Sequence, residues 1–365
     1  MKTMIMGDLS PTVDNEHLFF EGDKEALFGD FLPMLEGNDV NLLNLECALT
    51  EHDQKIKKFG PALKSHPNTA KLLREIGVNY CSVCNNHFFD FGKKGVEDSF
   101  RALNVQGIAY TGYGCNYEDA RRDLILEKQG ERVAVIAVCE HEYSYALEDR
   151  EGCRPFDEFD TMLDIRAAKE KNDRVIVIYH GGKEYCRYPS PRLRKLCRAM
   201  AAHGADLVLC QHSHCIGCYE RVQGCHILYG QGNFHFEEPS DKNLPECWNG
   251  GLAVHYDTVT NAVDFIPVVS NQKAGIRLAN EQERAQMMGE MEARNQSLAD
   301  GTWRERWHEF CESMRPVYEK AVSRAYREEA TEKHNHLFAH YLDCEAHTDV
   351  WRELFPTANL TNEKA

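Results

Sequence analysis

Short apolar runs alternate with amphipathic stretches over residues 1–270. The runs are bounded by Gly, Asn or Asp, and they predict strands at Lys2–Met6, Val40–Leu45, Asn79–Val83, Val133–Val138, Val175–Tyr179, Leu207–Leu209 and His226–Tyr229. The stretches between them predict helices at Lys24–Glu36, Pro67–Ile76, Lys94–Leu103, Asp157–Lys171 and Pro191–His203. Runs without polar alternation are typical of strands buried on both faces, and the alternation of strands with helices predicts an α/β layered fold.

Later in the chain the pattern changes twice. Paired apolar runs predict antiparallel hairpins, formed by Cys218–Val222 with Cys225–Tyr229 and by Leu252–Tyr256 with Ala262–Val269. From about Asn280 onward, apolar side chains recur mostly every three or four positions, which is typical of amphipathic helices. We therefore expect a main domain at residues 1–272 and a C-terminal α-helical appendage at 273–365, which either packs on the main domain or mediates self-association.

The appendage also carries a histidine cluster. Its members are His334, His336, His340 and His347. No acidic or cysteine partner stands at the tight spacing of a metal motif, so we interpret the cluster as a solvated helix face.

The charge balance narrows the range of partners. Among 365 residues, 42 basic and 58 acidic side chains give a net charge of −16, which argues against a nucleic acid or an anionic membrane surface as the main partner. No apolar run reaches the length of about 18 residues that a bilayer span needs, and the stretch before Gly7 is too short for a signal peptide. We therefore expect a cytoplasmic location, with most of the 15 cysteines reduced and buried as small hydrophobes.

Side chains that can bind metals follow the ends of several predicted strands. They are Asp8, Glu46, Asn86, His180, His212 and His214. Ligands gather beyond the carboxyl ends of strands in α/β sheets, and mixed carboxylate, amide and imidazole donors suit two divalent cations. Each residue alone is equally consistent with an ordinary turn or core position, but their shared placement favours a metal site. His87, next to Asn86, suits a general acid or a hydrogen-bond donor to the transition state.

In these motifs the chain resembles the bacterial poly-γ-glutamate capsule synthesis (CapA-like) proteins, a branch of the calcineurin-like metallophosphoesterase superfamily. The matching segments run in order through about residues 1–270: Gly7-Asp8, Asn44-Leu45-Glu46, Asn85-Asn86-His87 with Asp90, His180-Gly181-Gly182-Lys183-Glu184-Tyr185, His212-Ser213-His214 and Tyr229-Gly230-Gln231-Gly232-Asn233-Phe234. The resemblance implies a layered α/β/β/α sandwich. Ser10 stands where the superfamily usually has a histidine, and Glu46 replaces a bridging Asp; the capsule-synthesis branch shares both changes.

The resemblance also implies roles for individual residues. The ligands of one divalent ion would be Asp8, Glu46 and His214, with Glu46 bridging. The ligands of the other would be Asn86, His180 and His212. The catalytic residues would be His87 and Asp90, and the residues that line the substrate site or orient ligands would be Glu184, Asn233 and Asn85. Mn, Fe or Zn suits such a mixed set of donors.

Three functions remain open at this point. The first is a metal-dependent hydrolase, such as a phosphatase or phosphodiesterase, acting on a small phosphorylated or polyanionic acidic substrate. The second is a component of poly-γ-glutamate or related surface-polymer synthesis, with an amide-forming or polymer-processing role. The third is a non-catalytic, metal-stabilised scaffold. Basic residues that either line a cleft for a polyanion or form a solvated face are Lys55, Lys57, Lys58, Lys64, Arg192, Arg194 and Lys195.

Overall fold

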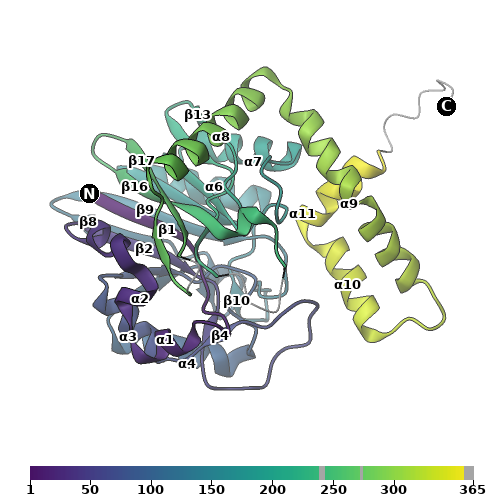
Figure 1. Cartoon of the computed structure of the whole chain (residues 1–365), viewed down its shortest axis with the longest axis horizontal. Helices are drawn as coiled ribbons and strands as arrows, with labels where there is room; N and C mark the ends of the chain where they lie inside the picture. The colour runs from purple at the N-terminus through teal and green to yellow at the C-terminus, as the bar shows by residue number, and fades with distance from the viewer. Residues whose placement is uncertain (238–242, 272–273, 357–365) are drawn as a thin grey trace.

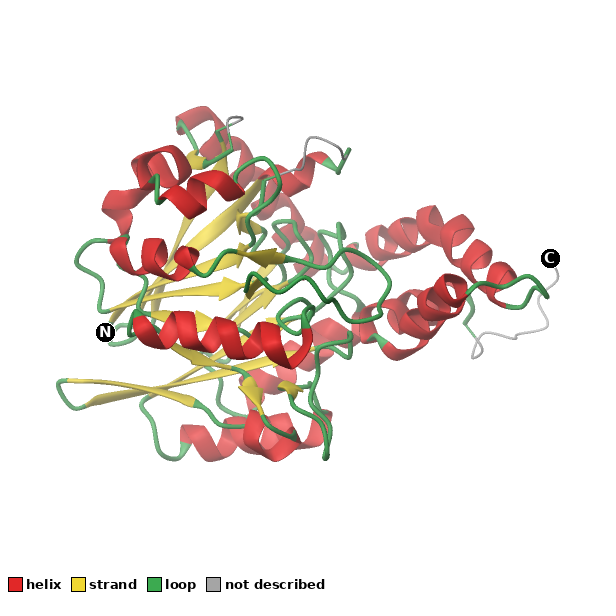
Figure 2. Cartoon of the chain, turned by 90° about the horizontal axis from the view of Figure 1, so that it is seen from below, coloured by secondary structure: helices red, strands yellow, loops and turns green. Residues whose placement is uncertain are grey.

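Two β-sheets lie face to face in the computed structural model, and helices cover their outer faces (Figures 1 and 2). The structure describes residues 1–237, 243–271 and 274–356. In Figure 2 the strands lie between helices above and below them, and the C-terminal helices project to one side. The predicted α/β/β/α sandwich with a C-terminal helical appendage is confirmed.

The first sheet has the strand order β18-β17-β16-β1-β2-β5-β6, and β15 also pairs with β1. Its strands are β1 (Lys2–Leu9), β2 (Val40–Leu45), β5 (Tyr80–Ser82), β6 (Ala109–Thr111), β15 (Asn233–His235), β16 (Gly250–Asp257), β17 (Ala262–Ser270) and β18 (Ile276–Leu278). β2 pairs in parallel with both β1 and β5, whereas β16 is antiparallel to β1 and β17. The carboxyl ends of β1, β2 and β5 therefore meet at one edge.

The second sheet has the order β13-β14-β12-β11-β9-β8. Its strands are β8 (Leu124–Lys128), β9 (Glu131–Cys139), β11 (Arg174–His180), β12 (Leu207–Gln211), β13 (Tyr219–Val222) and β14 (Cys225–Leu228). The central four are parallel, and β8 and β13 are antiparallel at the two edges. Short pairs elsewhere are β3 (Ala48–Leu49) with β4 (Lys64–Ser65), and β7 (Tyr113–Gly114) with β10 (Gly152–Cys153). Both predicted hairpins are confirmed.

Successive residues of β11 divide between two apolar cores. Ile176 and Ile178 pack in the core that the two sheets share. Val175 and Val177 pack on the opposite face, against the helices of the second sheet and the C-terminal helices. Because successive side chains of a strand point to opposite faces, this division shows that β11 is buried on both sides, as its unbroken apolar run predicts.

The α-helices in the described part of the main domain are α1 (Glu16–Glu21), α2 (Lys24–Phe28), α3 (Asn68–Glu75), α4 (Gly92–Val105), α5 (Tyr117–Ala120), α6 (Glu158–Lys169) and α7 (Pro191–Ala202), with 3₁₀ segments η1 (Gly29–Leu35) and η2 (Glu246–Asn249). Side-chain caps begin four of these seven α-helices, α2, α5, α6 and α7. The side chain of Ser190 accepts from the backbone N–H of Leu193, and Pro191 stands at the first position of α7. This combination fixes the start of α7 beside the metal-type residues of β11 and β12.

The predicted helix over Lys24–Glu36 is wrong in its second half. Asp23 caps α2 through its contact with the N–H of Ala26, but α2 ends at Phe28. Gly29 has a positive φ of 45°, and Pro33 lies inside the following 3₁₀ segment. Since proline has no N–H to donate, a continuous α-helix across this segment would lose a backbone hydrogen bond.

The C-terminal appendage consists of α8 (Glu281–Asp300), α9 (Trp303–Ala325), α10 (Glu332–Asp343) and α11 (Glu345–Leu354) (Figure 1). Asn280 and Glu283 form a capping box at the start of α8. Trp303, Trp307 and Cys311 of α9 are buried at four-residue spacing, as the amphipathic pattern predicts. The expected division between residues 272 and 273 and the last residues of the appendage, 357–365, lie outside the described residues.

No helix in the described part of the chain has both the length and the apolar character needed to cross a membrane.

Candidate metal centre

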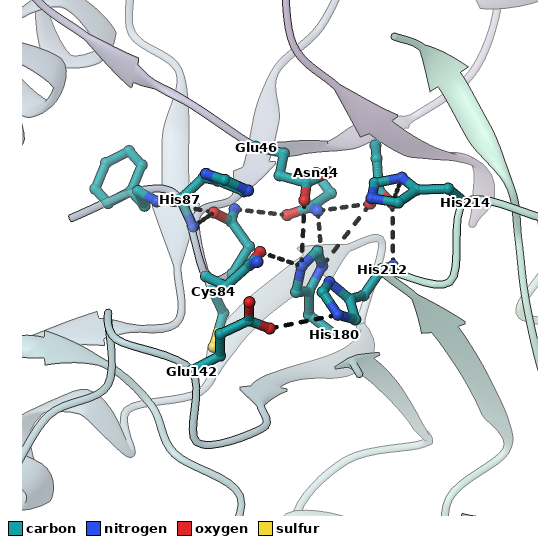
Figure 3. Close-up of polar contacts among 12 residues, drawn as sticks. Asn44, Glu46, Cys84, His87, Glu142, His180, His212 and His214 are labelled. Atoms are coloured by element: carbon teal, nitrogen blue, oxygen red, sulfur yellow. Dashed lines mark hydrogen bonds and ion pairs between the residues drawn. The ribbon is translucent and has the colours of Figure 1, made fainter. Parts of the chain in front are cut away.

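The strand ends of both sheets bring the expected metal ligands together (Figure 3). Donor atoms of Asp8, Glu46 and His180 lie within 4.8 Å of one another, and so do those of Glu46, His212 and His214. Asn86 joins the cluster because its Oδ1 lies 2.9 Å from Nε2 of His180. Glu46 belongs to both groups of donors. These two groups combine Asp8 with His180 and His212 with His214, whereas the predicted ligand sets combine Asp8 with His214 and His180 with His212. The assignment of each ligand to a particular ion therefore stays a prediction.

Glu46 is the feature of this cluster that most needs a cation. Its side chain is fully buried, and neither carboxylate oxygen accepts a hydrogen bond from any residue that the structure describes. Burial, together with the charge of Asp8, raises the pKa of Glu46 well above its ordinary value. A buried carboxyl without donors is costly, and divalent cations are what such a carboxylate would bind. The residues present therefore fit a metal site.

His212 and His214 each have a ring nitrogen without a hydrogen-bond partner among the described residues, whereas both ring nitrogens of His180 have polar neighbours, Asn44 at Nδ1 and Asn86 at Nε2. Nδ1 of His214 lies 2.8 Å from Oδ1 of Asn233, which leaves Nε2 free. Nε2 of His180 lies 3.5 Å from Oε1 of Glu46, as well as beside Asn86. Nδ1 of His212 is buried and has no hydrogen-bond partner among the described residues. Metal-binding histidines are commonly oriented in this way, by a partner on the other nitrogen.

Backbone strain is concentrated at the same place. His212 and His214 have positive φ values of 81° and 52°, and nearby Tyr185 has 64°. Residues with side chains seldom adopt this left-handed region, and such conformations cluster at functional sites. The N–H of His212 donates to Oδ2 of Asp8 at 3.0 Å, so the strained turn is held against the end of β1.

Two asparagines, Asn44 and Asn85, form hydrogen bonds that hold the cluster and the loop beside it in place. Nδ2 of Asn44 donates to Oδ1 of Asp8 at 2.7 Å and lies 3.2 Å from Nδ1 of His180. Asn85 donates to Oδ1 of Asn44, and its own Oδ1 accepts from the N–H of His87 at 3.1 Å. Asn85 therefore shapes the loop after β5, and a role for it in substrate binding stays a prediction.

His87 and Asp90 form a buried pair at the edge of the cluster. Nδ1 of His87 lies 2.7 Å from Oδ2 of Asp90, which is fully buried. Lys58 makes an ion pair with Asp90 and lies 3.1 Å from His87 Nδ1. Burial and the charge of Lys58 lower the pKa of His87. A solvated face is the wrong interpretation for Lys58, because its side chain is only 3% exposed.

Comparison with known proteins shows the family of the chain that carries this cluster. Residues 2–238 match the family model described as "Bacterial capsule synthesis protein PGA_cap". The chain belongs to this family. The family resemblance that the ordered motifs indicated is therefore confirmed.

Two curated relatives show how far the similarity extends. "Capsule biosynthesis protein CapA" of Bacillus anthracis is 28% identical over 255 residues, covering 67% of this chain and 61% of the relative. "PGA biosynthesis protein CapA" of Bacillus subtilis (strain 168) is 29% identical over 220 residues, covering 59% of this chain and 57% of the relative. The chain thus spans less than two thirds of the length of either relative.

A solved structure gives a weaker match. A 5'-nucleotidase from Candida albicans SC5314 is 8% identical, with a TM-score of 0.41, and the match covers 75% of this chain and 52% of that chain.

Glu142 of this PGA_cap protein is a site residue that sequence reasoning missed. Oε2 of Glu142 lies 3.4 Å from Nε2 of His212 (Figure 3). Burial alone would raise the pKa of Glu142, but the imidazoles of His212 and His340 lower it below its ordinary value. Its place in the sequence could have indicated this role. Glu142 closely follows β9, which ends at the same sheet edge as the neighbouring parallel strand that carries His180.

Glu184 and Asn233 are the other two predicted residues of the substrate site. Glu184 is partly exposed and lies 3.5 Å from Nζ of Lys183, whose side chain is 5% exposed. Nδ2 of Asn233 donates to the carbonyl of Trp248 at 2.9 Å, and the indole ring packs on His214 with centroids 4.3 Å apart. Asn233 thus orients His214, and direct contact of either residue with substrate stays a prediction.

The interpretation of the tail histidines as a solvated face is wrong for His340 and His347. Each side chain is 8% exposed, and their rings pack at 4.5 Å. Tyr318 of α9 lies 2.6 Å from Nδ1 of His347 through its hydroxyl oxygen. The face of α10 and α11 that carries these rings is turned toward the main domain, which helical spacing alone does not reveal.

Proposed function

We propose that this PGA_cap protein is a hydrolase that uses two divalent metal ions and acts on a phosphorylated or other polyanionic acidic substrate. The observation that carries the proposal is Glu46, a buried carboxylate without hydrogen-bond donors that is common to two groups of metal-type side chains. A single structural ion would not need donors on both sides of one carboxylate. This arrangement is what a dinuclear centre with a bridging carboxylate requires.

The residues that would hold the metals come from five strand ends. One ion would be held by Asp8, Glu46 and His214. The other would be held by Glu46, Asn86, His180 and His212. When bound, a pair of ions such as Mn, Fe or Zn supplies an activated water and neutralises charge on the substrate.

His87 would handle the proton on the leaving group. Asp90 holds Nδ1 of His87 at 2.7 Å, so the ring has one fixed orientation and its Nε2 remains for the substrate. Lys58 fixes Asp90 in turn through their buried ion pair. His87 can then donate a proton or a hydrogen bond to the departing oxygen, with Asp90 as the group that orients it.

The test combines metal content with turnover. Elemental analysis of protein purified without chelator should find about two equivalents of transition metal, and a Glu46→Ala, His180→Ala double variant should lose them. The wild-type protein should then hydrolyse phosphoesters in a Mn- or Zn-dependent manner. Absence of stoichiometric metal from the wild-type protein, even after divalent supplementation, would overturn the proposal.

Family membership favours a second candidate function, a role in poly-γ-glutamate or related surface-polymer synthesis. Metal ions can position a polymer of carboxylates as well as a phosphate. Turnover of γ-glutamyl peptides but not of phosphoesters, with the same metal dependence, would favour this function. Bound metal without turnover of either substrate class would favour the non-catalytic scaffold.

A further inference from the structure

The loop after β9 joins the C-terminal helices to the metal centre. We refer to Glu140–Tyr143 as the connecting segment. Oε2 of Glu140 accepts from the backbone N–H of Ala346 at 3.1 Å, and the side chain of His141 lies 2.6 Å from Oε1 of Glu345. The N–H of His141 also donates to Glu345 at 2.9 Å. The start of α11 is therefore fixed on this segment.

Glu142, in the same segment, contacts both the metal centre and α10. One of its oxygens lies 3.4 Å from Nε2 of His212, and the other lies 3.7 Å from Nε2 of His340 in α10. The carboxylate thus stands between an imidazole of the main domain and an imidazole of the appendage. At these distances the contacts are electrostatic, and they fix where the carboxylate can sit.

The ring of His340 is itself held in place. It stacks on Tyr143 with centroids 5.1 Å apart and an interplanar angle of 23°. His347 packs against it edge-on at 4.5 Å. Because both neighbours are aromatic, the ring orientation of His340 is determined by packing, and its Nε2 is aimed at Glu142.

We propose that His340, acting through Glu142, is a positioning residue of the metal centre: together they hold the ring of His212 so that its unpartnered Nδ1 faces a metal ion. The inference rests on the dinuclear centre proposed above and adds the dependence of that centre on the appendage. The physical reason is that a carboxylate on the second ring nitrogen of a metal-binding histidine fixes the ring orientation and raises its basicity. His340 lies outside residues 2–238, which the family model matches.

The experiment uses the full-length chain loaded with Co²⁺ as a spectroscopic probe. His340→Phe keeps an aromatic ring between Tyr143 and His347 but removes the polar contact with Glu142. His340→Gln retains an N–H of similar reach. The matched control is His336→Phe in the same helix, because His336 is partly exposed and its contact is with Glu332, 3.8 Å away.

We expect His340→Phe to weaken the second Co²⁺ equivalent about tenfold, the lower end of the usual effect of such partners, and to alter the visible Co²⁺ absorption. His340→Gln should restore both, and His336→Phe should match the wild-type protein. Glu142→Gln provides a second route if His340→Phe does not fold, and should weaken the same equivalent by about 10- to 100-fold. Affinity is measured by competition with a chromogenic chelator, and folding by thermal unfolding of the metal-free proteins.

Two results would overturn the inference. The first is unchanged affinity and spectrum in both His340→Phe and Glu142→Gln. The second is an equal loss in His340→Gln and His340→Phe that follows their thermal stability, because that would show a packing role. Failure of the wild-type protein to bind a second Co²⁺ is a separate outcome, which would remove the dinuclear centre and the proposed function with it.

Discussion

The strand-end loops of the main domain and the helical appendage contribute to the same site by different routes. In the main domain each expected ligand lies directly at or just past the end of a strand, as with His180 at the end of β11 and Glu46 after β2. In the appendage His340 lies within a helix and reaches the site only because α10 packs on the connecting segment. The strand-end ligands can therefore be located from their positions in the sequence. His340 can be located only from the packing of α10 on the main domain.

The two regions also differ in how polar groups are satisfied. Glu46 is buried without a donor among the described residues, whereas the buried acids at the appendage interface are paired. Asp349 of α11, for example, lies 3.0 Å from Nε of Arg192. A carboxylate placed between cations can be left without protein donors, as Glu46 is, whereas a structural interface neutralises its buried acids within the protein. The following predictions test this contrast, from the largest expected effect to the smallest.

The sharpest test of the main-domain site is Glu46→Gln. Loss of the charge common to both donor groups should remove both metals and reduce turnover to background. Unfolding of the metal-free protein should not occur at lower temperature than in the wild type, because the Glu46 carboxyl has no hydrogen bond among the described residues to lose. Glu51→Gln, at a side chain that is 78% exposed, is the control. Retention of both metals in Glu46→Gln would contradict the interpretation of Glu46 as a metal-binding carboxylate.

His87→Asn separates proton handling from metal binding. We expect kcat to fall by about 10²- to 10⁴-fold, the usual contribution of a general acid, with metal content unchanged. Steady-state kinetics and elemental analysis on the same preparation check both halves. If metal content falls in parallel with kcat, His87 supports the metal site and is not the acid.

Arg192→Met probes the appendage interface. Arg192 joins Glu140 at 2.6 Å and Asp349 at 3.0 Å, and its loss removes the nearest counter-charge from both buried acids. We expect a clear fall in the free energy of unfolding, below the roughly 3–5 kcal/mol of a buried charge left without any partner, measured by urea denaturation. Arg198→Met, whose side chain is 44% exposed, should have a much smaller effect. Equal effects would mean that the interface pairing contributes little.

Asp349 predicts a pH dependence at the same interface. Burial raises its pKa to about 6, against the opposing effect of Arg192. A carboxyl with a raised folded-state pKa binds its proton more tightly in the folded state, so the associated stability is present below about pH 4 and is lost as pH rises through 6. The stability advantage of the wild type over Asp349→Asn should therefore shrink by about 2 kcal/mol between pH 4 and pH 7. A difference that does not vary with pH would contradict the assignment.

The smallest effect is expected at the exposed contact between the regions. Lys57 pairs with Glu332 of α10 at 2.9 Å, but the two side chains are 80% and 64% exposed. Surface ion pairs contribute little, so Lys57→Ala should leave thermal unfolding and metal affinity unchanged. A clear loss of metal affinity would show that this outer contact also positions the appendage.

The sequence by itself determined the layers of the fold and the cluster of expected ligands. Unbroken apolar runs such as Val175–Tyr179 predict strands buried on both faces, and a polar residue placed directly after such a run has to emerge at the sheet edge. The spacing of Trp303, Trp307 and Phe310, mostly by three or four residues, likewise predicted helices after residue 280. Both signals are local, because the backbone period fixes which way a side chain points.

The way in which the appendage meets the site could not be predicted from the sequence. In the sequence, Lys58 is one of several basic residues and His340 is one of several histidines in the tail. In the structure, Lys58 pairs with Asp90 and His340 lies next to Glu142. Helical periodicity shows which face is apolar, but the partner of that face is set by packing between segments that are distant in the chain. The same holds for His212, since the turn that gives it a φ of 81° is stabilised by Asp8 at the far end of the sequence.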